Sequence, residues 1–211
     1  MLPGSSAPSA WRATLSGLSA TLVGIGLARF AYTPLIPALI AARWFDPAQA
    51  VYLGAANLAG YLAGALLAPS MAARAAAATI LRVMMALATV AFFACAFPLS
   101  FSWFFVWRFA SGLAGGALMA LAAPTVLPHV PASRRGLAGG AIFTGVGLGI
   151  AASGTLVPLL LRLGLVETWC GLGALALALT VLAWGGWPAA VNAPRPRRKL
   201  ASSEGLVRVC R

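Results

Sequence analysis

Two arginines lie inside long apolar stretches, where a charge is costly. Arg29 falls in the apolar run 13–42, and Arg108 falls in the run 101–127. An arginine in the middle of a bilayer costs at least about 2.5–3.5 kcal/mol, so a wet cavity, a partner or an anionic ligand usually accompanies it. Arginine binds carboxylate or phosphate through two parallel donors, so two unpaired guanidinium groups facing one cavity predict an anionic ligand. Structural alternatives stay open: Arg29 could pair with main-chain carbonyls of its own run, and Arg108 could snorkel to the surface.

Polar side chains near these arginines complete a candidate binding set. Tyr32 and Thr33 follow Arg29, and Asn57 and Tyr61 lie one helical turn apart in the run 50–68. Each of these four has a plainer interpretation, such as an interhelical hydrogen bond worth about 0.6 kcal/mol. The predicted substrate-binding residues are Arg29, Tyr32, Thr33, Asn57, Tyr61 and Arg108.

Catalytic and metal-binding functions find little support in the sequence. The run 137–161 contains Ser153, but no apolar run contains the His or Lys that would activate a serine nucleophile. The only histidine, His129, falls in a connector, and Cys95, Cys170 and Cys210 lack any paired spacing. No G-x-x-x-x-G-K-[ST] phosphate loop is present. We therefore expect a protein that is not an enzyme and that uses no metal and no cofactor.

The elements that position these residues are apolar enough to cross a membrane. Of the 211 residues, 61% are hydrophobic and only 9% are charged, against roughly 25% charged in soluble domains. Six apolar runs of helical length predict an all-α membrane protein with a leader at 1–11, a six-helix bundle at 13–187 and a basic tail at 188–211. The expected spans are 13–42, 50–68, 79–97, 101–127, 137–161 and 168–187, with a connector over 69–78 between the second and third.

The distribution of positive charge predicts the orientation of the bundle. An even number of spans places both termini on one side, and that side receives most of the fifteen Lys and Arg residues. These are Arg12, Arg74, Arg82, Arg134, Arg135, Arg195, Arg197, Arg198, Lys199, Arg208 and Arg211. Only Arg43 and Arg162 fall on the other side. The positive-inside rule then predicts cytoplasmic termini, and it attributes the net charge of +12 to membrane orientation rather than to nucleic acid. The cations of the tail are expected to face anionic lipid headgroups.

Glycines repeat at four-residue spacing within the runs. The pairs are Gly60 and Gly64, Gly112 and Gly116, Gly136 and Gly140, and Gly145 and Gly149. Such faces let helix backbones approach closely in a membrane. The pattern fits a static bundle and helices that slide against one another equally well.

Three passages resemble the N-terminal half of a major facilitator superfamily transporter of the YbfB/YjiJ type. Residues 24–37 read GIGLARFAYTPLIP, residues 108–116 read RFASGLAGG with the superfamily's R-x-x-x-G pattern, and residues 145–149 read GVGLG. The loop motif between helices two and three departs from the superfamily, because Ala68 and Ala72 stand where Asp and Gly are expected.

The resemblance implies half of a two-bundle fold, built from two inverted three-helix repeats, with helices 1 and 4 lining the cavity. It implies a proton-coupled or facilitative secondary transporter in a bacterial inner membrane that works by alternating access. The two arginines, rather than the resemblance, predict that its small solute is an anion. We expect a truncated or half-length form whose partner is a second six-helix half or a second copy of the chain. A non-transporting membrane scaffold or accessory protein is the alternative.

Overall fold

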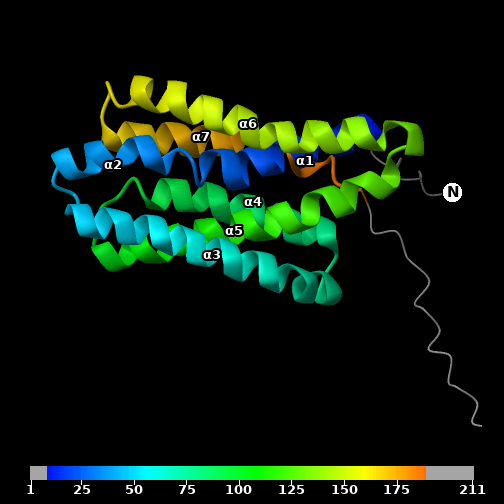
Figure 1. Cartoon of the computed structure of the whole chain (residues 1–211), viewed down its shortest axis with the longest axis horizontal. Coiled ribbons are helices and arrows are strands. Elements are labelled where there is room, and N and C mark those ends of the chain that lie inside the picture. Colours follow the sequence, from blue (N-terminus) through cyan, green and yellow to red (C-terminus); the bar gives the residue numbers. More distant parts are fainter. Residues whose placement is uncertain (1–8, 189–211) are drawn as a thin grey trace, which may run out of the picture.

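A computed structural model describes residues 9–188, and these residues form helices and turns without any strand. The main helices are α1 (Ala10–Thr21), α2 (Tyr32–Ala41), α3 (Pro47–Arg74), α4 (Ala77–Ala94), α5 (Phe101–Val126), α6 (Arg135–Leu160) and α7 (Leu165–Trp184). They lie side by side along the long axis of the molecule (Figure 1). When α1 and α2 are counted as one span, 6 helices in the described part are long and apolar enough to cross a membrane. The expected all-α, six-span class is confirmed.

One predicted connector is wrong. The segment 69–78 is predicted to be a connector, yet α3 runs through Pro69 to Arg74, and only residues 75–76 separate it from α4. A proline removes one main-chain hydrogen bond, to the residue four positions earlier. The residues that follow, Met71, Ala72 and Ala73, are strong helix formers, so the helix continues.

Local signals explain where several helices begin. Asp46 caps α3: its carboxylate accepts a hydrogen bond from the amide of Gln49 at 2.7 Å, and the Gln49 side chain accepts one from the Asp46 amide at 3.2 Å. Ser100 caps α5 in a similar way, since its hydroxyl accepts from the amide of Trp103 at 3.1 Å. Gly164 precedes α7 with φ +136°, a conformation that favours glycine. These caps fix the short turns at one end of the bundle.

The first span is irregular in its middle. Residues Leu22–Leu27 form a π-helix, and residues 28–31 form a wide turn before α2 begins. The amide of Ala28 bonds to the carbonyl of Val23, five residues back, at 3.1 Å. Widened turns of this kind are frequent at functional sites. Here the irregular residues 22–31 include Arg29, and their π-helical part contacts α5 and α6.

Glycines bring α3 and α5 into main-chain contact. A methyl group added at Gly60 or Gly64 would overlap main-chain atoms of α5, and one added at Gly112 or Gly116 would overlap main-chain atoms of α3. The π-helical segment makes equally close contacts with α6, where Gly26 meets Gly149.

The predicted pairs therefore pack helices together, with one exception among the described residues. Gly136 and Gly140, at the start of α6, have nothing within 4 Å of the position a methyl group would take.

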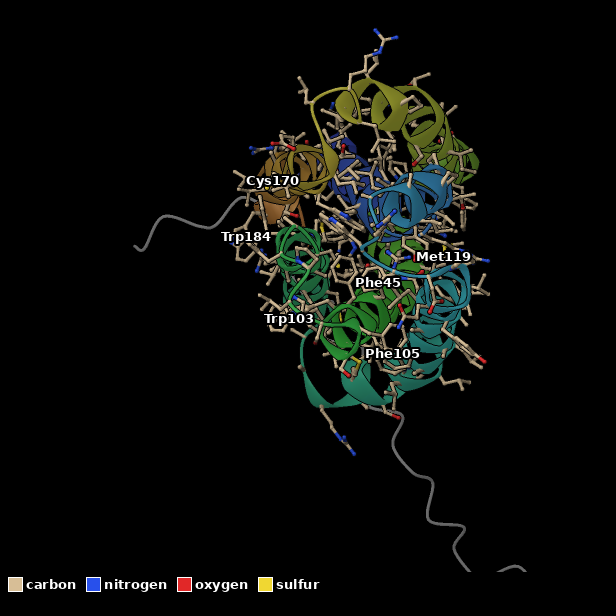
Figure 2. All side chains as sticks on the ribbon, turned by 90° about the vertical axis from the view of Figure 1, so that its left-hand side faces the viewer. Phe45, Trp103, Phe105, Met119, Cys170 and Trp184 are labelled. Carbon is tan, nitrogen blue, oxygen red and sulfur yellow. The ribbon has the colours of Figure 1, made fainter. Side chains whose placement is uncertain are left out.

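Aromatic rings fill the end of the bundle that carries the 42–46 loop. Phe45 packs edge-on against Phe104 with ring centroids 4.8 Å apart, and Phe104 contacts Trp169 at 5.9 Å. Figure 2 looks down the bundle from this end and shows Phe45 near its centre. At the opposite end the two ends of the described chain lie together, because the Ser16 hydroxyl donates to the carbonyl of Ala183 at 3.1 Å.

Candidate functional site

A pocket of about 370 Å³ opens between α2, α3 and α5, in the half of the bundle nearer the 42–46 loop. It contains five of the six predicted site residues: Arg29, Tyr32, Thr33, Asn57 and Arg108. These residues come from three different helical spans, so the bundle gathers side chains that are nearly eighty positions apart in sequence.

Arg108 is the buried cation of this pocket. Its side chain is only 2% exposed, and its Nη1 donates to the carbonyl of Ala28 at 2.9 Å. The guanidinium carbon lies 4.2 Å from the centroid of the Tyr32 ring, which is close enough for a cation–π interaction. Its Nε is buried without a hydrogen-bond partner in the described part of the chain. The side chain thus points inward, toward the first span, and does not snorkel to the surface.

Arg29 has the opposite environment. Its side chain is exposed, although the residue lines the same pocket. The guanidinium carbon lies 5.7 Å from the ring centroid of Phe30 and 5.7 Å from that of Tyr61. Tyr61 does not line the pocket itself, so it joins the predicted set only through Arg29. The sequence does not show which of the two arginines is buried, whereas the structure buries Arg108 and leaves Arg29 exposed.

Tyr32 and Asn57 each tie two helices together at the pocket. The Tyr32 hydroxyl donates to the carbonyl of Ala50 at 2.8 Å, joining α2 to α3. The Asn57 side-chain amide donates to the carbonyl of Arg108 at 3.0 Å, joining α3 to α5. Both side chains are buried, and Thr33 is exposed. The Tyr32 hydroxyl hydrogen and one of the two Asn57 amide hydrogens are therefore engaged, so the arginines, Thr33 and the second Asn57 N–H are the donors left for a ligand.

The charge of the pocket is positive and uncompensated. No acidic residue lines it, and the acids of residues 9–188 are Asp46, which caps α3, and Glu167, in the first turn of α7. Neither acid forms an ion pair with the pocket arginines. A buried guanidinium beside a cavity with no carboxylate favours an anion in that cavity.

The rest of the pocket wall is apolar, and sequence reasoning did not assign it. Ile36 comes from α2, and the other lining residues come from α3: Ala50, Val51, Gly54, Ala55 and Leu58. Their spacing from Asn57 along the helix could have predicted most of them. Gly54 lies one turn before Asn57, and Ala50 and Val51 lie one turn earlier still, so they share its face.

Other polar candidates lie away from the pocket. His129 Nδ1 is 3.1 Å from the carbonyl of Thr125, in the connector before α6. The Ser153 hydroxyl donates to the carbonyls of Gly149 at 2.7 Å and Gly26 at 3.2 Å, so it bridges α6 and the π-helical segment. Within residues 9–188 no group of three His, Cys, Asp or Glu could hold a metal ion. Cys210 and the basic tail lie outside the described residues.

Comparison with known proteins gives one match. A family model described as "Uncharacterised MFS-type transporter YbfB" matches residues 21–210, which is most of the chain. No curated protein and no solved structure matches the chain. The matched region includes all six residues of the predicted binding set and the pocket that five of them line.

Proposed function

This chain belongs to the family of MFS-type transporters that includes YbfB, and from this membership we propose that it transports a small organic anion across a membrane. The observation that carries the proposal is the buried Arg108 guanidinium, which lines a pocket without any acidic residue. Membership of the family accounts for a multi-pass membrane protein that acts on a small-molecule solute. The charge of that solute follows from the pocket.

The donors of the pocket define the chemical group that would bind. Arg108 and Arg29 supply positive charge, and Thr33 adds a hydroxyl. A carboxylate can accept from both guanidinium groups, whereas an ammonium group would meet two like charges and no counter-charge. We therefore expect a carboxylate or a similar anion, and we expect amines to be rejected.

The remaining walls define the body of the solute. Ile36, Val51 and Leu58 face the same cavity as the arginines. Ligand sites commonly combine an apolar lining with a few polar groups that fix orientation. An anion with a compact aliphatic or aromatic body matches this lining better than a sugar or a polycarboxylate.

A direct binding test uses the purified full chain in detergent and follows its thermal unfolding. Benzoate is the anionic probe, and benzylamine and benzyl alcohol are its cationic and neutral counterparts. Benzoate should raise the unfolding temperature, and the other two should not. A charge-assisted hydrogen bond contributes about 1.5–3 kcal/mol, so Arg108→Gln should weaken benzoate binding roughly tenfold to a hundredfold.

Two further variants make the binding test specific. Arg108→Lys keeps the charge without the two-pronged donor and should lose part of the affinity. Arg162→Gln removes an exposed arginine outside the pocket and should leave benzoate binding unchanged. Equal stabilisation by benzylamine and benzoate would overturn the proposal, and so would full benzoate binding by Arg108→Gln.

The proposed transport mechanism is alternating access, in which one helical bundle rocks against another around a central site. The described bundle exposes apolar side chains on α3 and α6, among them Leu62, Leu66 and Phe143, which are 60%, 69% and 48% exposed. Gly136 and Gly140 of α6, which have nothing within 4 Å of an added methyl group, are also exposed. We infer that a second six-helix unit, from another polypeptide or from a second copy of the chain, packs here. Its copurification in mild detergent tests this inference.

The proposed orientation places both ends of the described chain, which lie at one end of the bundle, on the cytoplasmic side of a bacterial membrane. The end that holds Ser16 and Ala183 is also the basic end. Its described cations are Arg12, Arg74, Arg82, Arg134 and Arg135, against Arg43 and Arg162 at the other end. Cytoplasmic loops collect positive residues in this way. Alkylation of a cysteine placed at Ser133, in intact cells and in inverted vesicles, tests the orientation: inverted vesicles should react faster.

A membrane scaffold remains the second candidate, because the pocket residues also tie helices together. Arg108, Tyr32 and Asn57 each take part in a hydrogen bond between spans. If that is their whole function, Arg108→Gln changes stability and benzoate has no effect on the natural chain. Uptake of labelled benzoate into liposomes that contain the chain, with its second unit where one copurifies, separates the two candidates.

A further inference from the structure

A second groove lies at the basic end of the bundle, between the start of α1 and the start of α6. Its volume is about 190 Å³. Ala10, Trp11 and Thr14 form one wall, and the connector before α6 and the first turns of α6 form the other. In Figure 1 both helix ends lie at the right-hand end of the molecule. The pocket lined by Arg29 and Arg108 lies toward the opposite end, so this groove is a separate feature.

The outer part of the groove is polar and positively charged. Arg134 lines it and is exposed, and Trp11 is 67% exposed with an indole N–H available as a donor. No acidic residue lines the groove, and both acids of residues 9–188 are at the other end of the bundle. Arg135 follows at the start of α6, and its Nε donates to the carbonyl of Val130 at 3.2 Å, which holds the connector in place.

The inner part of the groove is apolar and runs along the helices. Leu137 and Ala141 lie one turn apart on α6, and Ala138 and Val130 lie beside them. Leu137 is 80% exposed, so its side chain is left for lipid or another apolar group to cover. A groove with a cationic mouth and an apolar floor parallel to the helices has the polarity of a phospholipid that stands beside the protein.

We propose that this groove binds an anionic phospholipid, with its phosphate at Arg134 and Trp11 and the start of an acyl chain along Leu137 and Ala141. Basic pockets between transmembrane helices bind anionic headgroups, and tryptophan is enriched at the level of the headgroups. The volume suits a phosphate and the first part of a chain rather than a whole lipid. The rest of the acyl chain would continue along α6 on the side of Leu137 and Ala141, which differs from the side that carries Gly136 and Gly140.

The test is native mass spectrometry of the purified full chain in detergent, with phosphatidylglycerol or phosphatidylethanolamine of the same acyl composition. Phosphatidylglycerol should be retained several-fold more than phosphatidylethanolamine. Arg134→Gln should lower the phosphatidylglycerol-bound fraction about fivefold, as expected for one arginine near a headgroup. Ala141→Phe, which fills the floor while keeping the charge, should also lower it.

The matched control is Arg74→Gln, because Arg74 is an exposed arginine of the same end that does not line the groove. Its phosphatidylglycerol retention should equal that of the natural chain. Equal retention of the two lipids would overturn the proposal, as would equal losses in Arg74→Gln and Arg134→Gln, which would indicate diffuse attraction. Displacement of the lipid by inorganic phosphate alone would show that the site recognises the free anion. Thermal unfolding of each variant excludes a folding defect as the cause.

Discussion

The close contact between α3 and α5 predicts a large effect of one methyl group. In Gly112→Ala the added methyl carbon would lie far inside 3.0 Å of the carbonyl oxygen of Asn57 and would also press on the amide of Tyr61. A carbon and a carbonyl oxygen normally stay about 3.3–3.6 Å apart, so the two helices must separate by more than about 1 Å. A gap of about 0.5–1 Å already removes about a quarter to a half of the dispersion attraction across it.

The expected cost of Gly112→Ala is about 1–3 kcal/mol, the usual range for overpacking. Alanine also favours a helix by up to about 1 kcal/mol over glycine, which would hide part of this cost. Gly140→Ala is the matched control, since Gly140 is also helical but has nothing within 4 Å of the new methyl group. The propensity gain is common to both variants, so the difference between them isolates the contact.

Thermal unfolding in detergent, followed by circular dichroism, measures this difference. At about 2–4 °C per kcal/mol, Gly112→Ala should unfold roughly 2–12 °C below Gly140→Ala. Because Asn57 and Arg108 lie on the two separated helices, benzoate binding should fall in Gly112→Ala alone. If the two variants unfold at the same temperature, the main-chain contact between α3 and α5 is not as described here.

Three other substitutions test single contacts, each by the same unfolding measurement on the full chain. Asp46→Ala removes the cap of α3 and should cost about 0.5–2 kcal/mol, and Asp46→Asn should recover most of it. Ser153→Ala removes the bond to the carbonyl of Gly26 and should cost about 0.6 kcal/mol, with a value above ~1.7 pointing to a wider rearrangement. Tyr32→Phe removes the bond to Ala50 and should cost about 1 kcal/mol while keeping the ring under the guanidinium, so benzoate binding should persist. A loss of benzoate binding in Tyr32→Phe would assign the hydroxyl to the solute.

The six spans could be predicted because hydropathy over about twenty residues depends on the chain alone. The candidate pocket could be predicted in part, because a charge inside an apolar run is visible wherever it faces. Which arginine is buried could not be predicted, since burial depends on the neighbouring helices. Arg108 points toward Ala28 of the first span, whereas Arg29 points to the open side of the pocket.

Two other features show where local sequence is insufficient. The sequence predicts a connector over 69–78, but Pro69 removes only one hydrogen bond, and the following alanines sustain α3. The pair Gly136 and Gly140 has the same spacing as Gly112 and Gly116, yet the first pair lies open and the second is in main-chain contact. Spacing shows that two helices are able to approach closely, and only the bundle geometry shows whether they do.

The irregular hydrogen bonding of residues 22–31 gives the first span two mechanical parts. α1 is anchored to α7 through Ser16, and α2 is anchored to α3 through Tyr32. A regular helix would transmit a tilt from one end to the other. A span interrupted by a π-helix and a turn lets α1 and α2 tilt separately, each with the helix to which it is bonded. The guanidinium of Arg108 donates a hydrogen bond to the carbonyl of Ala28, which lies within this irregular segment. A solute that bound this guanidinium and broke its bond to Ala28 would therefore change how firmly residues 22–31 are held, as well as fill the pocket.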